Sequence, residues 1–299
     1  CLYNALMDLS IIILSYNTAE LTAQCLMSVL NSLDKDPSVK SEVIVWDNNS
    51  TDSSVKTLKH IVDPRIRIVA SKENLGYTGG NNEATKLAKG RSLLFLNSDT
   101  IAIEDAVPKL YNFFIHQKGF DFIGARLLNK DKSPQASSGR FYTLPVAFAA
   151  LFLKGDSWGA SRWPVRKIRK VDWVSGAAFI TKKETFESLN GFDNSLFMYW
   201  DEIDLLYRAS QKKLVTGTYP DAAFIHLEGA SSNSRTQPIL KVFQGYLFFY
   251  KKHYSPLQQS LIQYMLQLKA IVSLMIGKIT GNNYLIETYS QAYEITKKN

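Results

Sequence analysis

"LSIIILSYN", residues 9–17, is a run of aliphatic side chains that ends in polar ones. Such a run is typical of a buried strand followed by a turn. The pattern returns in three later stretches, "SEVIVWDNNSTDSS" (41–54), "RIRIVAS" (65–71) and "RSLLFLNSD" (91–99). The chain between them contains the predicted helices 18–33, 55–61 and 82–90. Strands that alternate with helices form a parallel sheet covered on both faces, so the sequence predicts an α/β fold.

Each predicted strand leads into a polar cluster: "SYN" (15–17), "DNNSTD" (47–52), the glycine-rich turn "NLGYTGGNN" (74–82) and "NSD" (97–99). In a parallel sheet these carboxyl ends meet at one edge, where ligands bind. We therefore expect a nucleotide-binding site, with Asp47 and Asn48 near a base or ribose. The full expected set is Ser15, Tyr16, Asn17, Asp47, Asn48, Asn74, Gly76, Gly80, Asn81, Asn97 and Arg235. Each cluster alone also fits a turn, a helix cap or close packing of glycine.

Asp99 and His226 each follow an apolar strand. A carboxylate at a strand end can bind a divalent metal, which in turn can bind a diphosphate. The alternative for Asp99 is an N-cap of the helix that follows, and a lone histidine is more often structural than a ligand.

"FMYWDEIDLLYR" (197–208) places three carboxylates in an aromatic and aliphatic frame, where acids are uncommon. A helix that starts near Asp201 would be capped by that residue and would carry Asp204 in its first turn. Glu202 is then the acid expected to face a cleft. A carboxylate with apolar neighbours can have a raised pKa and can accept a proton from a substrate hydroxyl.

The 299-residue chain has a formal net charge of +8, which favours anionic partners such as nucleotide phosphates, nucleic acid or an acidic membrane surface. Its two cysteines, Cys1 and Cys25, form neither a disulfide framework nor a zinc site. No secretory signal is recognisable, so we expect a cytoplasmic protein.

The second half of the chain contains a mixture of strand and helix patterns. We expect strands in "FDFIGARLL" (120–128), in "VDWVSGAAFIT" (171–181) and in a segment ending at His226, with a basic loop over 161–173. From about residue 238 the chain is predicted to be helical. The apolar spacing over 261–274 indicates an amphipathic helix. It packs on the core or a second subunit, or it rests on the cytoplasmic leaflet of the membrane.

In their order along the chain, "SIIILSYN", "VWDNNSTD", "NLGYTGGNN", "LFLNSDT", "VSGAAFI", "FDNSLFMYWDEIDLLYR" and "HLEGASS" resemble the inverting family 2 glycosyltransferases with a GT-A fold. Among these the chain is most similar to bacterial rhamnosyltransferases of cell-wall and O-antigen assembly. The resemblance covers residues 8–235. It implies a Rossmann-like, mainly parallel sheet with flanking helices, followed by C-terminal helices. The implied divisions are a nucleotide-sugar-binding half (8–125), an acceptor-binding and catalytic half (126–237) and a helical extension (238–299).

The resemblance also implies roles for single residues. Asp47 matches the acid that binds the donor base, and Asp99 and His226 match the ligands of Mg²⁺ or Mn²⁺. Glu202 matches the catalytic base of an acidic pair with Asp201. The order here is Asp-Glu instead of the commoner Glu-Asp, so the choice between the two stays open.

The activity implied by the resemblance is transfer of L-rhamnose from dTDP-L-rhamnose to a glycan hydroxyl. UDP-galactofuranose, UDP-glucose and UDP-GlcNAc are the alternative donors. The implied acceptor is carried on a polyprenyl diphosphate, which would bring the protein to the inner face of the cell membrane. A homodimer is a further expectation.

Two other classes of function compete with this one. A nucleotidyltransferase would need a basic glycine-rich loop near the N-terminus, and "SYNTAELTAQ" (15–24) has neither glycine nor lysine. A nucleic-acid-binding module would use the basic residues of 162–170 with Trp163 and Trp173 to stack on bases. The simpler interpretation of that cluster is a solvated loop, and we expect no nucleic-acid partner.

Overall fold

The computed structural model describes residues 7–227 and 236–297, apart from the side chains of 236–238. The chain forms two compact units. The first comprises Cys1–Gly139, Trp163–Phe197 and Asp201–Ser231. The second comprises Arg140–Arg162, Met198–Trp200 and Ser232–Asn299. Both sides of the expected division at residue 125 lie in the first unit, and the assignment of a donor half and an acceptor half stays a prediction.

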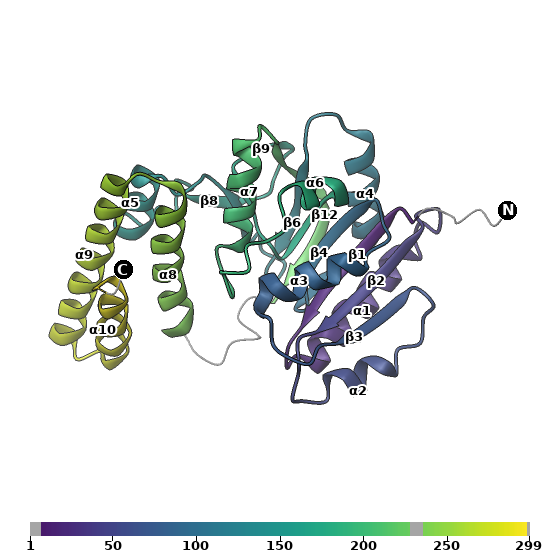
Figure 1. Ribbon diagram of the computed structural model, residues 1–299, viewed down its shortest axis with the longest axis horizontal. Helices are drawn as coiled ribbons and strands as arrows, with labels where there is room; N and C mark the ends of the chain where they lie inside the picture. The colour runs from purple at the N-terminus through teal and green to yellow at the C-terminus, as the bar shows by residue number, and fades with distance from the viewer. Residues whose placement is uncertain (1–6, 228–235, 298–299) are drawn as a thin grey trace. The chain divides into compact units, whose positions relative to one another are not determined.

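A central sheet organises the first unit, with strand order β3-β2-β1-β4-β11-β6-β12-β5 (Figure 1). Its strands are β1 (Leu9–Ser15), β2 (Ser41–Asp47), β3 (Ile66–Ala70), β4 (Ser92–Asn97), β5 (Thr100–Ala102), β6 (Phe122–Leu128), β11 (Ala178–Lys182) and β12 (Thr216–His226). β1 to β4 are parallel, as are β6 and β12, whereas β11 runs antiparallel to β4 and β6. The predicted fold class, a mainly parallel α/β sheet with flanking helices, is confirmed.

Helices cover both faces of this sheet (Figure 1). They are α1 (Ala19–Leu33) and α4 (Ala106–His116) on one face, and α3 (Gly76–Leu87) and α6 (Lys183–Ser188) on the other; α2 (Ser54–Lys59) packs on α1, and α7 (Asp201–Gln211) packs on β10. Side chains alternate along β1, so Ile11 and Ile13 join the core beneath α1, while Leu14 lies beneath α3. Burial on both faces explains why the strands appear in the sequence as unbroken apolar runs.

α3 begins earlier than the sequence predicted. We expected a glycine-rich turn over 74–82 and a helix from residue 82, but the helix starts at Gly76. A β-carbon at Gly80 would overlap the side chain of Leu14 and lie 3.2 Å from Trp46 Cδ1. The glycine therefore lets the helix approach the sheet closely, and this tertiary contact outweighs the low helix propensity of glycine.

The predicted basic loop over 161–173 was wrong in part. It contains β8 (Arg162–Pro164), β9 (Arg169–Val171) and the start of β10 (Trp173–Val174). β9 pairs with β12, while β10 and β8 flank β7 (Ala136–Gly139) in a second small sheet. The single strand expected over 171–181 is likewise two strands, β10 and β11. Strands of two or three residues are too short to show an alternating pattern, so only their pairing partners define them.

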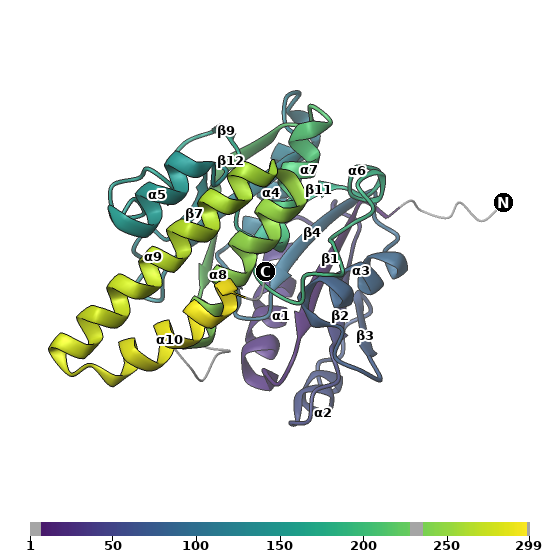
Figure 2. The same ribbon diagram turned by 60° about the vertical axis from the view of Figure 1, so that its left-hand side comes forward.

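The second unit is helical, as the sequence predicted from residue 238 onward. It consists of α5 (Leu144–Phe152), α8 (Thr236–His253), α9 (Pro256–Thr280) and α10 (Asn283–Lys297). α8, α9 and α10 lie side by side (Figure 2). Its aromatic core packs Trp200 against Tyr142, Tyr246 and Phe249. Within the described ranges, α9 is the one helix long and apolar enough to cross a membrane.

Candidate active site

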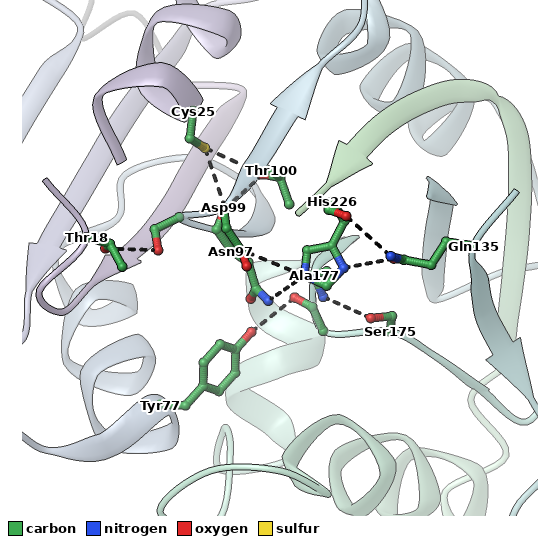
Figure 3. A network of polar contacts seen from close by, with 12 residues as sticks. Thr18, Cys25, Tyr77, Asn97, Asp99, Thr100, Gln135, Ser175, Ala177 and His226 are labelled. Atoms are coloured by element: carbon green, nitrogen blue, oxygen red, sulfur yellow. Dashed lines mark hydrogen bonds and ion pairs between the residues drawn. The ribbon is translucent and has the colours of Figure 1, made fainter. Parts of the chain in front are cut away.

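Asn97, Asp99 and His226 lie together where β4 and β12 end (Figure 3). A tight turn closed by a 2.8 Å hydrogen bond from Thr100 Oγ1 to the Asn97 carbonyl sends the chain back into β5. β5 pairs with β12, and this pairing brings His226 beside the turn. His226 Nε2 is 3.4 Å from Asp99 Oδ1 and 3.5 Å from Asn97 Nδ2. The sheet therefore brings together three of the residues selected from the sequence.

Gln135 fixes the orientation of the His226 ring. Its Oε1 is 2.8 Å from His226 Nδ1, while its Nε2 donates to Asn129 Oδ1 at 3.0 Å and to the His226 carbonyl at 3.3 Å. A side-chain amide oxygen only accepts, so Nδ1 must carry the hydrogen. The lone pair of the neutral ring is then on Nε2, which faces Asp99.

This arrangement fits a divalent cation. The Asp99 carboxylate and His226 Nε2 are typical metal ligands, and Asn97 Oδ1 is buried without a hydrogen-bond partner among the described residues. A metal-binding histidine almost always donates its other ring N–H to an oxygen acceptor, and Gln135 Oε1 supplies such an oxygen here. The described parts of the chain contain no group of three or more His, Cys, Asp or Glu that could hold a metal ion by itself. The protein would thus supply a partial ligand set that phosphate oxygens and water complete.

The acid pair Asp201 and Glu202 opens α7, as the sequence predicted. The 175–177 turn lies against the acid pair. A β-carbon placed on Gly176 would be 3.2 Å from Tyr77 Oη and 3.8 Å from both Asp201 Oδ2 and Glu202 Cβ. The same turn contacts the end of β4 through a 3.1 Å hydrogen bond from the Asn97 amide to the Ala177 carbonyl. One turn therefore connects the acid pair with the Asn97, Asp99 and His226 cluster.

Burial raises the pKa of both acids. The pKa of Asp201 lies well above its ordinary value, first because the carboxyl is buried and then because Glu202 is close. Burial also raises the pKa of Glu202, although the backbone N–H groups of Gly176 and Ile203 stabilise its charged form and oppose that shift. Both acids thus favour the protonated form more than a free carboxyl group does, and backbone N–H groups oppose the shift in each of them.

Tyr77 is a site residue that the sequence reasoning missed. Its hydroxyl donates to the Gly176 carbonyl at 3.0 Å. Burial, followed by the charges of Asp201, Glu202 and Asp99, raises its pKa well above the ordinary value. The hydroxyl is therefore neutral. Tyr77 stands within the quoted glycine-rich stretch, but nothing in the sequence indicated its contact with residue 176, and Gln135 carried no signal at all.

Asp204 has a structural role, as expected for an acid outside the cleft. Its carboxylate is fully buried and accepts a 2.7 Å hydrogen bond from Arg208 Nε. The Arg208 guanidinium also donates to the carbonyls of Leu189 and Gly191. This buried pair fastens α7 to the loop that precedes it.

The residues expected to bind a nucleotide fall into two groups. At the end of β1, Ser15 Oγ lies 2.9 Å from Thr22 Oγ1, and Tyr16 is half exposed. Asn17 Oδ1 accepts a 2.7 Å hydrogen bond from the Thr51 amide, which ties the loop after β1 to the loop after β2.

The second group supports the start of α3. Asn48 Nδ2 donates to Asn74 Oδ1 at 2.7 Å and to the Gly76 carbonyl at 3.0 Å. Asn81 is buried, and its amide donates to the carbonyl of Tyr77. Asp47 accepts from the Ser50 amide through Oδ2, while its buried Oδ1 has no partner among the described residues. Asp47 Oδ1 is thus the free acceptor of this group.

Arg235 and most of "HLEGASS" lie outside the described residues. In the basic cluster, the Arg169 guanidinium lies 4.5 Å from the ring centre of Trp163, and Trp173 is buried. The Trp173 ring is therefore not available to stack on a base, and the Arg169 guanidinium covers one face of the Trp163 ring.

The sequence profile of the family described as "Glycosyl transferase family 2" matches residues 10–178, more than half of the chain. The matched range holds all four polar strand ends and the 175–177 turn. The chain belongs to glycosyl transferase family 2. The family expected from the sequence is thereby confirmed, whereas rhamnosyl specificity is not settled by this match.

This family 2 glycosyltransferase is similar to proteins of glycan synthesis. The low-salt glycan biosynthesis hexosyltransferase Agl10 of Haloferax volcanii is 28% identical over 224 residues, which are 73% of this chain and 67% of Agl10. The UDP-Glc:alpha-D-GlcNAc-diphosphoundecaprenol beta-1,3-glucosyltransferase WfaP of Escherichia coli is 30% identical over 122 residues, which are 41% of this chain and 47% of WfaP. The match therefore spans less than half the length of the latter relative.

Among solved structures, the mannosyltransferase PcManGT from Pyrobaculum calidifontis, in complex with GDP-Man and Mn²⁺, has a TM-score of 0.60. The comparison covers 97% of this chain and 85% of PcManGT at 16% sequence identity. At that identity the likeness shows the fold alone, and it agrees with the GT-A expectation.

Proposed function

We propose that this chain transfers a hexosyl group from a nucleotide-diphosphate sugar to a hydroxyl of a growing glycan, in one displacement that inverts the anomeric carbon. The observation that carries the proposal is the contact of the 175–177 turn with both halves of the site. One half, Asn97, Asp99 and His226, suits a metal-bound diphosphate. The other half, Asp201 and Glu202, suits proton removal from an acceptor.

The leaving diphosphate needs its charge neutralised. A divalent cation, when bound, supplies that positive charge. Asp99, Asn97 and His226 would hold it, and Gln135 keeps His226 Nε2 directed toward Asp99. The base and ribose of the donor would lie at the ends of β1 and β2, where the buried Asp47 Oδ1 can accept a hydrogen from a base N–H.

Proton removal falls to the acid pair. We take Glu202 as the carboxylate that accepts the proton of the acceptor hydroxyl, as the sequence resemblance implies, with the buried carboxyl of Asp201 beside it. Tyr77 stays neutral and holds the 175–177 turn against the pair. No protein nucleophile is required, because the acceptor oxygen attacks the anomeric carbon directly.

The donor we test first is dTDP-L-rhamnose, which follows from the sequence resemblance. UDP-glucose stands beside it because the name of WfaP specifies that donor. UDP-galactofuranose and UDP-GlcNAc complete the panel. The acceptor we propose is a glycan on a polyprenyl diphosphate, in line with the name of WfaP, and the reaction would then take place at the cytoplasmic side of a membrane.

The test is a donor panel with the purified chain. Release of nucleoside diphosphate is measured for each donor with Mg²⁺, with Mn²⁺ and with EDTA, and the anomeric configuration of any product is determined by NMR. We expect one donor to be turned over, with loss of the reaction in EDTA and an inverted product. Retention of configuration, or turnover that EDTA does not change, would contradict the mechanism.

A further inference from the structure

The positive charge of the chain is concentrated in the second unit. That unit contains eleven Lys and Arg but only three Asp and Glu, while the first unit contains 24 of each sign. The second unit therefore carries a formal +8 and the first is neutral. Such segregation attracts an anionic partner specifically to the helical unit.

α9 in this unit has an apolar stripe on each side. One stripe, formed by Ile262, Leu266, Ala270, Ser273 and Gly277, is buried inside the unit. The opposite stripe, which we call the outer stripe, is exposed and consists of Leu257, Leu261, Tyr264, Leu268, Ile271, Val272, Met275 and Ile279. At 100° per residue the outer stripe occupies one continuous side of the helix. A contiguous exposed apolar surface of this kind marks an interaction site.

The region around α5, which packs against α9, adds exposed apolar side chains. Phe148, Leu153 and Trp158 are all about half exposed or more, and Trp158 is 60% exposed. Trp158 Nε1 donates to the Leu153 carbonyl at 2.9 Å. The polar atom of the indole is therefore satisfied, and the ring can enter an apolar phase without losing a hydrogen bond.

Exposed lysines accompany these apolar groups. Lys154 follows Leu153, Lys251 and Lys252 end α8 just before α9 begins, and Lys278 borders the outer stripe next to Ile279. Apolar side chains flanked by lysine match a bilayer surface with negatively charged headgroups. They do not match a second copy of the chain, which would bring the same +8 charge to the interface.

The contacts of α9 indicate that it lies on the surface instead of crossing it. Gln263 Nε2 donates to the Thr296 carbonyl of α10 at 2.7 Å, and Ser273 hydrogen-bonds to Tyr289 of α10. A spanning helix would have to give up these contacts and the packing of its buried stripe. We propose that the outer stripe of α9, with Phe148, Leu153, Trp158 and the adjacent lysines, docks the protein on an anionic lipid surface. This docking goes beyond the proposed sugar transfer and does not depend on it.

The experiment is sedimentation of the chain with unilamellar vesicles, either of phosphatidylcholine alone or of phosphatidylcholine with phosphatidylglycerol. We expect binding to the anionic vesicles only, and a decrease in binding as salt is raised. The triple substitution Leu268→Gln, Ile271→Gln and Met275→Gln should weaken binding at least ~10-fold. The charge variant Lys154→Gln, Lys251→Gln and Lys278→Gln should do the same and reduce the salt dependence, because each lysine near the surface contributes about a fivefold factor.

Matched controls come from exposed positions of the first unit. Met27→Gln, Val62→Gln and Ile115→Gln remove apolar side chains that are 45%, 93% and 47% exposed, and Lys59→Gln, Lys118→Gln and Lys130→Gln remove charges that are likewise exposed. We expect both control variants to bind vesicles like the unchanged chain. Circular dichroism and nucleoside-diphosphate titration of every variant show whether folding and the donor site are intact, so a failure of docking is distinguishable from a failure of the proposed function.

Three results would overturn the proposal. The first is failure of the unchanged chain to bind anionic vesicles at low salt. The second is an equal loss of binding in control and test variants, which would mean that net charge alone is responsible. A dimer in analytical ultracentrifugation that the outer-stripe variant dissociates, with no vesicle binding, would instead make this surface an interface between two copies.

Discussion

Asp201 and Glu202 are neighbours in the sequence, yet their carboxyl groups have different surroundings. Both carboxyls are buried, and backbone N–H groups near the start of α7 favour the charged form of each. The N–H of Gly176 adds to this at Glu202, whereas the charge of Glu202 opposes it at Asp201. Two acids in different environments can take different roles. At the scale of single residues, we propose Glu202 as the base, as the sequence resemblance implies, with Asp201 as its buried neighbour.

Replacing the proposed base tests that assignment. Glu202→Gln keeps the size of the side chain but removes its basicity, so we expect turnover to fall by about two to four decades with donor affinity nearly unchanged. Steady-state kinetics measures the turnover, and a calorimetric titration measures the donor affinity. If Glu202→Gln remains active and Asp201→Asn is dead, the roles of the two acids are reversed.

Asp201 also has a predicted effect on stability. Its pKa in the folded state lies above the unfolded value of about 3.9, so its stabilising contribution is complete below that pH and is lost as pH rises toward the folded value. Asp201→Asn removes this loss and should raise the free energy of unfolding at pH 7. Urea unfolding at pH 7 and at pH 4 measures the effect. A gain that is equally large at pH 4 would contradict the pKa assignment.

Sequence reasoning identified the residues of the site that occupy strand ends or the start of a helix. Asn97, Asp99, His226 and the acid pair could be selected because their local patterns mark such positions. Tyr77 and Gln135 could not, since their roles depend on contacts with residues 176 and 226, far away in the chain. Positions that support a site through distant partners are visible only in the folded structure.

At the scale of elements, the beginning of α3 depends on Gly76. Its φ of +71° belongs to the left-handed region, and a β-carbon there would lie 2.5 Å from the Phe197 carbonyl oxygen. That carbonyl also accepts a 2.7 Å hydrogen bond from the Tyr77 amide. The glycine thus places both the helix start and the Tyr77 side chain.

Gly76→Ala should therefore lower the free energy of unfolding by about 2–4 kcal/mol, the combined cost of left-handed strain and steric overlap. The matched control is Gly119→Ala, where a β-carbon meets no atom within 4 Å and the change should be within about 0.5 kcal/mol. Urea unfolding of both variants makes the comparison. Equal stability of the two would show that the turn into α3 tolerates a side chain.

The elements that the sequence predicted are those with strong local patterns. β1, β2 and β4 are apolar runs, and α8 to α10 have helical spacing. The start of α3 was missed because its glycines oppose a helix locally, while packing on the sheet favours it. β8 and β9 were missed, and β10 was not separated from β11, because two or three residues do not show a period.

At the scale of the whole molecule, the candidate active site and the excess positive charge belong to different units of the chain. The neutral first unit contains the strand ends, the acid pair and Tyr77, and the second unit contains the excess of Lys and Arg. Since the two units belong to one chain, attachment of the second to a membrane would concentrate the first there as well. The proposed activity requires that the first unit binds a metal-chelated nucleoside diphosphate at Asn97, Asp99 and His226.

Calorimetric titration of UDP and dTDP into the full chain, with Mn²⁺ and with EDTA, tests that claim most directly. We predict metal-dependent binding of one nucleotide that Asp99→Ala and His226→Ala abolish and that Gln135→Ala weakens about 10–100-fold through the His226 ring. The exposed His116 and Asp131, substituted by alanine, provide controls that should bind normally. Unchanged affinity in Asp99→Ala and His226→Ala, or tight binding in EDTA that none of these substitutions alters, would contradict the account.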